Sequence, residues 1–470
     1  MLCSCFSQGL ARPVERRADR IRRNDKSLTF VEIYDFYCDV VEILDALKNN
    51  TVVKEITFNT ETLRPENQEA QVKMFEVMQC NKSVASLNIL LDRQNQVFAV
   101  MATSGWSSIQ ELVLRDPFCF MSLREAEDVS NFILQSENLR TLSLCAVGVE
   151  TTTIMEALSR TKVQSLKISF YSPFSLQNGG RQLATALERC ACITELRLEI
   201  RSYNDQVDFF QILLLESIPK MMGLKKLELD INSRCDQQFY DMVGHCIGGH
   251  QGEIEELRLI LRCSSVNISV VGLASALRRL KVVRFYSYEG LSSHTICELS
   301  GIVADCDTLE EFGYSLLLNE FLDGISADNF KAICQLCSRF PNLKRVTQDP
   351  TCTRQLDLRG ETQFVAFLEM VKRSKTIEQV PVFRFRTVEE KAAIKHHCRN
   401  NMIHNQIERI RKKGLLAATV PSSAWPLILK EFSDMPDVLY YLLQQKHGAM
   451  IGLHDMIASG NKTLISVYYG

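Results

Sequence analysis

Residues 193–198 read Ile-Thr-Glu-Leu-Arg-Leu, and residues 224–229 read Leu-Lys-Lys-Leu-Glu-Leu. Each stretch has aliphatic residues at its first, fourth and sixth positions, and this phrase recurs with small changes along most of the chain. Its copies begin at Val53, Val84, Ile109, Leu139, Val163, Ile193, Leu224, Ile254, Leu280, Leu309, Leu343 and Ile377. The shortest interval is 24 residues (163 − 139) and the longest is 34 (343 − 309). A phrase that returns at such a period is typical of a repeat protein whose units stack along one axis.

Each repeat is predicted to contain one strand and one helix. The fourth and sixth positions of the phrase alternate as the inward residues of a β-strand do. Helical stretches are expected after most copies, at Glu66–Cys80, Leu123–Leu134, Gly180–Cys190, Gln237–Ile247, Thr295–Ala304 and Asp328–Cys337. Crossover helices make successive strands parallel. Because packed helices need about 8–10 Å and neighbouring strands only about 4.8 Å, the array bends with its strands on the concave side.

The phrase, the repeat length and the helical return resemble the leucine-rich repeats of the ribonuclease-inhibitor-like type. The resemblance covers about residues 28–385 and implies an α/β solenoid, a horseshoe with about 12 parallel strands on the concave face and helices on the convex face. Leu28, Val31 and Ile33 predict an additional opening strand, with Phe36–Lys48 as its helix. The family's ladder asparagine is kept at Asn232, but Glu61, Pro117 and Val147 stand at the matching position of other repeats. We therefore expect irregular loops in the repeats that lack it.

Three segments follow from this organisation: a disordered basic tail at 1–27, the leucine-rich repeat domain at 28–385 and a helical C-terminal cap or module at 386–470. The tail is basic, because residues 1–26 hold seven basic and three acidic residues, a net charge of +4. In the third segment, Val388–Lys413 predicts one long helix that stops at Gly414.

The C-terminal segment also resembles a known class of tail. Ile407–Leu443 is similar to the segments that follow leucine-rich arrays in uncharacterised diatom proteins, with Trp425-Pro426-Leu427 opening one helix and Leu439-Tyr440 lying in another. That class has no assigned activity to transfer. Two interpretations stay open: the segment caps the last repeat, or it docks a peptide.

The cysteines and the hydropathy favour an intracellular protein. There are 17 cysteines without paired spacing, and the first residues do not resemble a signal peptide, so a reducing compartment is expected. No apolar run approaches the length of a transmembrane helix. Cys3 and Cys5 lie just before the basic residues, where acylation together with the positive charge would attach the chain peripherally to a membrane. Two alternatives to membrane attachment stay open for these residues: a plain flexible tail and a nuclear-import signal. The expected location is cytoplasmic, with membrane association or a nuclear location as the alternatives.

Side chains that alternate with the buried aliphatics are expected on the concave face. The central column reads Thr57, Asn88, Val113, Ser143, Lys167, Arg197, Glu228, Arg258, Arg284 and Gly313. The column before it reads Glu55, Ser86, Glu111, Thr141, Ser165, Glu195, Lys226, Glu256, Val282 and Glu311. Charge signs alternate between neighbouring repeats, which stabilises a sheet by about 0.2–1 kcal/mol per pair.

Two interpretations of this face compete. In one, the charges only neutralise one another. In the other, the face binds a protein, and its contact residues are Lys167, Arg197, Glu228, Arg258, Arg284, Tyr203 and Tyr286, since Arg and Tyr are enriched at interface hot spots. The basic members form no continuous stripe with interleaved aromatics, so nucleic acid is not the expected partner.

The sequence offers only weak candidates for catalytic, cofactor-binding or metal-binding sites. The glycine cluster Gly248–Gly252 lacks the lysine of a phosphate-binding loop. Cys334 and Cys337 fall within a predicted helix and are expected to pack in the core. His396, His397, Cys398 and His404 lie on one helix without the spacing of a zinc site. We therefore expect no cofactor, no metal and no enzymatic activity.

The sequence predicts a non-enzymatic intracellular scaffold or recognition protein that binds another protein. Two further classes stay open. One is a substrate receptor or regulator in ubiquitin transfer. The other is a small-GTPase-activating protein that uses a loop arginine, for which Arg115 and Arg201 are the candidates. Neither the partner nor the oligomeric state follows from the sequence.

Overall fold

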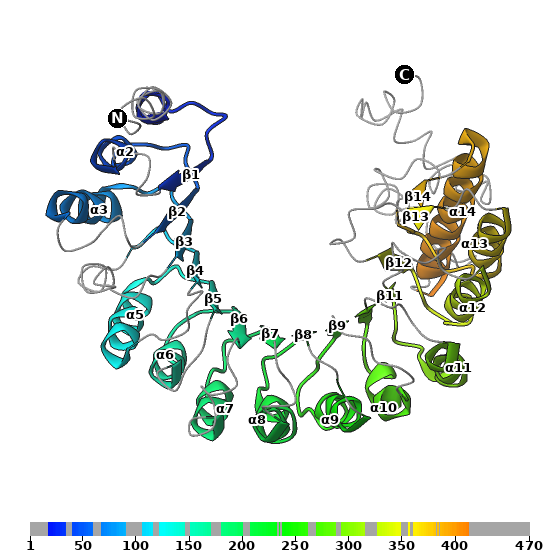
Figure 1. Cartoon of the computed structure of the whole chain (residues 1–470). Helices are drawn as coiled ribbons and strands as arrows, with labels where there is room; N and C mark the ends of the chain where they lie inside the picture. The colour runs from blue at the N-terminus through cyan, green and yellow to red at the C-terminus, as the bar shows by residue number, and fades with distance from the viewer. Residues whose placement is uncertain are drawn as a thin grey trace, which may run out of the picture. The chain divides into compact units, whose positions relative to one another are not determined.

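The computed structural model of the 470-residue chain (Figure 1) describes residues 17–33, 40–59, 67–90, 106–115, 122–145, 151–170, 180–200, 207–232, 235, 237–261, 269–287, 293–314, 327–348, 356–357, 361–381, 383–384 and 386–412. The chain divides into two compact units, each described here by itself. Unit 1 comprises Met1–Ile302 and Tyr314–Asn319, and unit 2 comprises Val303–Gly313 and Glu320–Gly470.

The strands form one twelve-stranded sheet whose order follows the chain. They are β1 (Phe30–Ile33), β2 (Glu55–Asn59), β3 (Ser86–Leu90), β4 (Glu111–Arg115), β5 (Thr141–Cys145), β6 (Ser165–Phe170), β7 (Glu195–Ile200), β8 (Lys226–Ile231), β9 (Glu256–Leu261), β10 (Val282–Ser287), β11 (Glu311–Tyr314) and β12 (Arg345–Gln348). Every pair from β1 to β10 is parallel. This arrangement confirms the predicted leucine-rich repeat solenoid.

The predicted number of strands is right, but their membership differs at both ends. The opening strand is confirmed as β1. The last phrase, at Ile377, contributes only an isolated parallel bridge between Arg345 and Gln379. Its later residues turn away, because Phe383–Arg384 (β14) pairs with Leu356–Asp357 (β13) in a separate two-stranded sheet.

Helices follow the strands of unit 1 along one side of the sheet, on the outer side of its curve (Figure 1). Their bounds are α2 (Val40–Leu47), α3 (Gln68–Cys80), α5 (Leu123–Gln135), α6 (Thr151–Leu158), α7 (Gly180–Glu188), α8 (Val207–Ile212), α9 (Gln237–Gly248), α10 (Ala274–Leu277) and α11 (Ser293–Ile302), with a 3-10 turn, η7 (Val271–Leu273), before α10. The aliphatic positions of the phrase fill the space between sheet and helices; Leu196, Leu198 and Leu229 are all buried.

Buried polar side chains join one repeat to the next at the turn before the strand. Asn81 Nδ2 donates to the carbonyl oxygens of Leu47 (2.6 Å) and Asn50 (3.1 Å). Ser83 Oγ donates to the carbonyl oxygens of Asn50 and Val53, both at 2.9 Å. Three carbonyl groups spaced three residues apart are thus satisfied by side chains of the following repeat, as buried backbone groups require.

The expected disorder of 1–27 is wrong for its second half. Residues 17–22 are helical, and Ala18 and Ile21 are fully buried. Their spacing places both on one face of a helix, and this face packs on the first repeat. The segment is too short and too charged for its periodicity to stand out in the sequence. Cys3 and Cys5 lie outside the described residues.

This N-terminal segment also satisfies backbone groups of the first repeat. Arg17 Nη1 donates to the carbonyl oxygen of Glu32 in β1, the outermost strand (3.0 Å). Asn50 Nδ2 donates to the carbonyl oxygen of Ile21 (2.6 Å). An unpaired edge strand invites association with other chains, and here two hydrogen bonds join residues 17–21 to the first repeat beside that strand.

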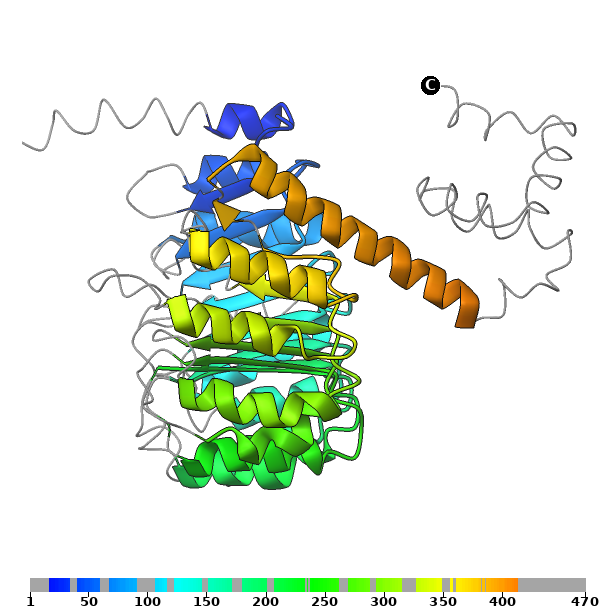
Figure 2. The same cartoon turned by 90° about the vertical axis from the view of Figure 1, so that its right-hand side faces the viewer.

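The longer helices among the described residues of unit 2 are α12 (Ala327–Cys337), α13 (Glu361–Arg373) and α14 (Val388–Lys412). The long helix predicted from 388 is confirmed as far as Lys412, and Gly414 and the Trp-Pro-Leu segment lie outside the described residues. Thr387 and Glu390 form a capping box at its start, because Thr387 Oγ accepts from Glu390 N (3.2 Å) and the Glu390 carboxylate accepts from Thr387 N (3.3 Å). Figure 2 shows α14 running obliquely past α13.

The side chain of Asn401 in α14 donates hydrogen bonds to backbone carbonyl groups of the last repeat. Its Nδ2 atom donates to three carbonyl oxygens, those of Val371 (3.2 Å), Ser374 (2.7 Å) and Ile377 (2.9 Å). These positions have the same three-residue spacing as Leu47, Asn50 and Val53. The helix therefore makes the bonds that a following repeat makes elsewhere in the array.

Acid is expected to loosen the packing of α14. The pKa of His397 lies below its usual value of 6.5, mainly because burial disfavours the charged imidazolium and also because Lys372 and His396 are close. A histidine with a lowered pKa supports the fold while neutral, so its contribution is present above about pH 6.5 and falls as the pH drops below that value. The protection factors of the α14 amides, which are corrected for the intrinsic pH dependence of hydrogen exchange, should fall between pH 7.5 and 5.5, and less so in His397→Gln. An equal acid response in His397→Gln and wild type would contradict the assignment, and replacement of the exposed His404 on the same helix, His404→Gln, is the control.

Among the described helices, none combines the length and the apolar character that a membrane span requires.

Candidate functional site

The predicted columns of the concave face exist as predicted. In the central column Lys167, Arg197, Glu228, Arg258 and Arg284 are consecutive partners across β6 to β10. We define the charged strand face as the charged, sheet-borne residues of β6–β10 on this side, namely Lys167, Glu195, Arg197, Glu199, Lys226, Glu228, Asp230, Glu256, Arg258 and Arg284. The set contains five acidic and five basic residues, so its formal net charge is zero.

Ion pairs join the charged strand face from strand to strand over β6–β8. Lys226 Nζ lies 2.6 Å from the Glu195 carboxylate, and this hydrogen bond raises the pKa of Lys226. Arg197 lies 2.9 Å from Glu228 and 3.5 Å from Asp230. These contacts confirm the predicted alternation of sign as actual pairing.

The first pair of this network lies between β6 and β7. Lys167 Nζ is 3.1 Å from the Glu199 carboxylate, and the same carboxylate accepts from Ser169 Oγ at 3.1 Å. Glu199 is two residues past the central column, so the pair runs diagonally across the two strands.

The network continues from β8 to β10. Arg258 Nη1 lies 3.1 Å from Glu228, which therefore binds two arginines. Arg284 pairs with Glu256 on the neighbouring strand. Each arginine is thereby held by a carboxylate on an adjacent strand, and at least one ion pair joins every two neighbouring strands from β6 to β10.

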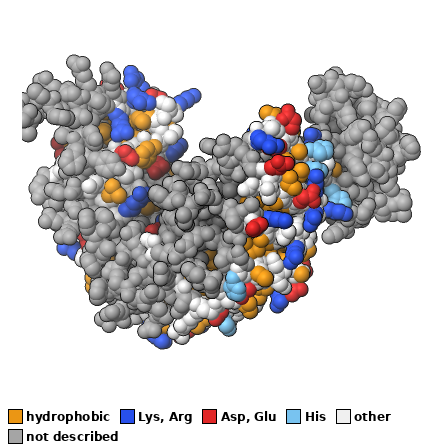
Figure 3. All heavy atoms as spheres, turned by 45° about the vertical axis from the view of Figure 1, so that its right-hand side comes forward, with side chains coloured by type: hydrophobic (Ala, Val, Ile, Leu, Met, Phe, Trp, Pro, Cys, Tyr) orange, Lys and Arg blue, Asp and Glu red, His pale blue; other side chains and the backbone are white. Residues whose placement is uncertain are grey.

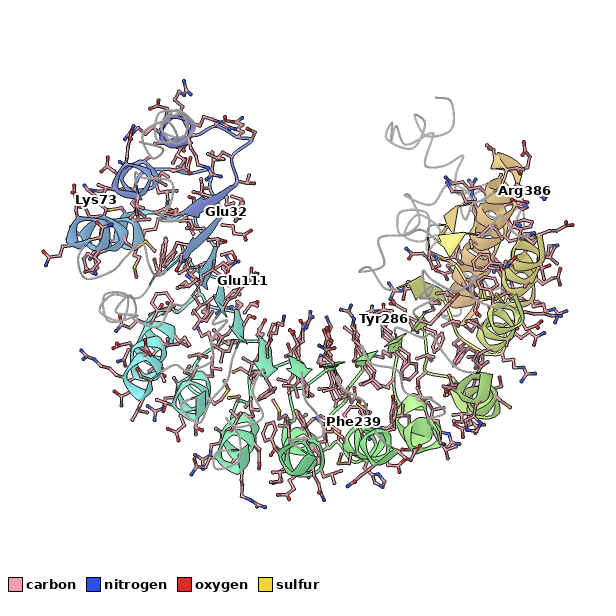
Figure 4. All side chains as sticks on the ribbon, viewed as in Figure 1. Glu32, Lys73, Glu111, Phe239, Tyr286 and Arg386 are labelled. Carbon is pink, nitrogen blue, oxygen red and sulfur yellow. The ribbon has the colours of Figure 1, made fainter. Side chains whose placement is uncertain are left out.

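Tyr286 is not the exposed contact residue that the sequence predicts. Its side chain points to the concave side, opposite to Phe239 on α9 (Figure 4), but only 3% of the residue is exposed. It lies beside buried Ile260, and the Arg258 guanidinium sits 5.1 Å from its ring centroid. Tyr286 thus supports Arg258 through a cation–π contact. Tyr203, the other predicted aromatic contact, lies outside the described residues.

The sequence reasoning missed two acidic members of the face, Glu199 and Asp230. Both lie two residues beyond the central column and therefore on the same side of the sheet. Asp230 is fully buried although it faces the concave side. The sequence could have predicted both residues, since the alternation of inward and outward side chains continues for one more step in the six-residue strands β7 and β8.

The surface does not concentrate one sign of charge. Positive and negative side chains are intermixed on the side visible in Figure 3, among the coloured residues. The charged strand face itself has five acidic and five basic members, which is not the stripe of one sign that favours nucleic acid.

The other sequence candidates are not members of the charged strand face. Cys334 and Cys337 are buried in α12, and burial raises the pKa of Cys337 to about 12, so its thiolate is disfavoured. Arg115 is exposed at the end of β4, while Arg201 lies outside the described residues. His396 and His397 stand side by side on α14 with ring centroids 5.7 Å apart. Within the described ranges, no three His, Cys, Asp or Glu side chains are grouped as metal ligands would be.

No family model and no curated protein matches the chain. Among solved structures, the leucine-rich repeat-containing protein LegL7 from Legionella pneumophila is 11% identical, and the match covers 76% of this chain and 93% of LegL7 with a TM-score of 0.40. A chain of the yeast Rad7 and Elc1 complex is 12% identical, with 75% and 85% covered and a TM-score of 0.39. Both TM-scores are below 0.5, so the leucine-rich repeat assignment rests on the strand register and helix placement of this chain itself.

Proposed function

We propose that the chain is a non-enzymatic scaffold that binds another protein through the charged strand face. The observation that supports this proposal is the series of ion pairs that joins every two neighbouring strands from β6 to β10, in which long side chains are already held in place. Ordering a flexible side chain at an interface opposes binding by about 0.5–1.5 kcal/mol, and a pre-ordered face avoids much of that loss.

The competing interpretation is that the charges only stabilise the sheet. Lys226 and Glu195 have 52% and 44% of their side chains exposed, and a pair with such exposure contributes about 0–1 kcal/mol to folding. These side chains can therefore be exchanged with little loss of stability, which separates a binding role from a folding role in an experiment.

The decisive variant exchanges the two charges, Glu195→Lys together with Lys226→Glu. It keeps the pair and the net charge but reverses the pattern that a partner meets. We expect an unchanged melting temperature and loss of the partner in affinity capture from the native cell, followed by quantitative mass spectrometry.

A matched control lies on the helical side of unit 1. Glu188 and Lys220 form a pair at 3.2 Å, and the exchange Glu188→Lys with Lys220→Glu should leave the captured partner unchanged. If the strand-face exchange also recovers the same partner in the same amount, the charged strand face is not the binding site.

The finer assignments are proposals of the same kind. We propose the ribonuclease-inhibitor-like type, supported by the regular helix that follows most strands, and a cytoplasmic location with peripheral membrane attachment through Cys3 and Cys5. A Cys3→Ser, Cys5→Ser variant that fractionates with membranes as the wild type does would exclude attachment by acylation.

We also propose that α14 caps the array, supported by the bonds of Asn401 to the last repeat.

A further inference from the structure

The ion pairs of the charged strand face are layered by sign. Arg197 has 36% of its side chain exposed, whereas its partners Glu228 and Asp230 have 18% and 0%. Lys167 is more exposed than Glu199 (31% against 20%). In every ion pair of this face, the cation is at least as exposed as the anion.

Side-chain length explains the layering. Lysine and arginine place their charge four or five bonds from Cα, and they extend over the shorter carboxylates that lie close to the strands. On the helical side of unit 1 the order varies: Lys220 is more exposed than Glu188 (51% against 31%), whereas Lys73 is less exposed than Asp45 (26% against 49%). The face is neutral in formal charge, and its most exposed charged side chains are Lys226 (52%), Glu195 (44%), Arg197 (36%) and Lys167 (31%), so three of these four are cations.

Arg197 also has N–H donors beyond those that face its two carboxylate partners. A guanidinium has five N–H donors, and the carboxylates of Glu228 and Asp230 contact Arg197 through Nε and Nη2. Within the described part of the chain no partner is recorded for Nη1 of Arg197, which can therefore donate to a further acceptor. Carboxylates suit such a donor because they bind a guanidinium in a planar, bidentate manner.

We propose that the segment bound by the charged strand face is an acidic stretch of a partner protein, whose carboxylates are received by the outer layer of Lys167, Arg197 and Lys226. This inference rests on the proposed function, because it names the chemistry of the partner at the same face. The carboxylate layer beneath keeps the cations in position and disfavours a polyanion that would press close to the sheet.

The test uses the full chain and a fluorescein-labelled peptide of alternating glutamate and serine, followed by anisotropy. A peptide with glutamine in place of glutamate is the matched probe. We expect saturable binding of the acidic peptide, about tenfold weaker binding of the glutamine peptide, and affinity that falls as salt is raised.

Two double variants locate the binding. Lys167→Gln with Lys226→Gln should weaken the acidic peptide about tenfold, since each exposed pair contributes up to about a factor of five. Lys48→Gln with Lys220→Gln removes the same charge from the helical side and should leave the affinity within about twofold. Equal binding of both peptides, or equal losses in both variants, would refute the proposal.

The outcomes distinguish this inference from the proposed function. If the Glu195/Lys226 exchange abolishes partner capture but the acidic peptide does not bind, the face is a binding site for a partner of other chemistry. A single-stranded oligonucleotide that binds more tightly than the peptide, with the same dependence on Lys167 and Lys226, would replace the acidic protein segment by nucleic acid.

Discussion

Replacing Gly244 by alanine is expected to destabilise the repeat domain by about 3 kcal/mol, at the upper end of the range for overpacking a core. Gly244 lies within α9, where a Cβ atom would come 1.8 Å from the carbonyl oxygen of Gly272 in η7 and 2.7 Å from its carbonyl carbon. Both atoms belong to the backbone and cannot rotate away, so α9 and η7 must separate.

The helix α9 and the turn η7 also lie close together at Gly272. A Cβ atom at Gly272 would lie 2.1 Å from Oδ1 of Asp241 in α9. Glycine inside a helix is unfavourable by about 1 kcal/mol relative to alanine, so its presence at 244 is explained by this contact. Urea unfolding of the full chain and hydrogen exchange of the α9 amides measure the effect.

Gly301→Ala is the matched control. Gly301 also lies in a helix, α11, but no atom lies within 4 Å of the position where its Cβ would stand. Removing this glycine should stabilise the chain by about 0.5–1 kcal/mol. Opposite signs are therefore expected for the same substitution, and a similar change at both positions would disprove the packing explanation.

Replacing Asn401 by alanine is expected to destabilise unit 2 by about 1–3 kcal/mol, the range for buried polar groups that lose their partners. One amide with two N–H groups serves three carbonyl oxygens, so one N–H is shared. Alanine removes every one of these bonds while it favours the helix, so the loss is not an effect of helix propensity. Faster hydrogen exchange of α14 and of the residues near Ile377 should accompany the loss.

Asn400→Ala tests whether the effect is specific. Asn400 is the neighbouring residue of α14, it is exposed, and its Nδ2 contacts only the ring nitrogen of His396 at 3.0 Å among the bonds described. Its replacement should change stability by no more than about 0.5 kcal/mol. Asn401→Asp adds a second check, because a carboxylate facing carbonyl oxygens should be worse than alanine. Equal stability of the Asn400 and Asn401 variants would remove the proposed capping role.

Much of the fold could be predicted from the repeated phrase. The register of the central column from Thr57 to Arg284 is the one that alignment of the phrases predicts, because each phrase labels its own strand. The helix bounds agree closely as well, as Leu123–Gln135 shows against a predicted Leu123–Leu134.

The candidate site was predictable only in part. Its central residues were found, because they alternate with aliphatic residues in the same strand. The burial of Tyr286 and Asp230 was not, because it depends on which side chains lie over them. The folded state of residues 17–22 was missed for a similar reason, since Ala18 and Ile21 are apolar enough to pack but too few to form a visible pattern.

The sequence by itself determined which face of each strand every residue occupies, because alternation is a local property of an extended chain. The tertiary structure alone decided which charges pair. Arg197 reaches Asp230 across 33 residues of chain, and Asn401 reaches Ile377 across 24. Such contacts depend on the spacing of stacked repeats and on side-chain lengths, and these distances exist only once the chain has folded.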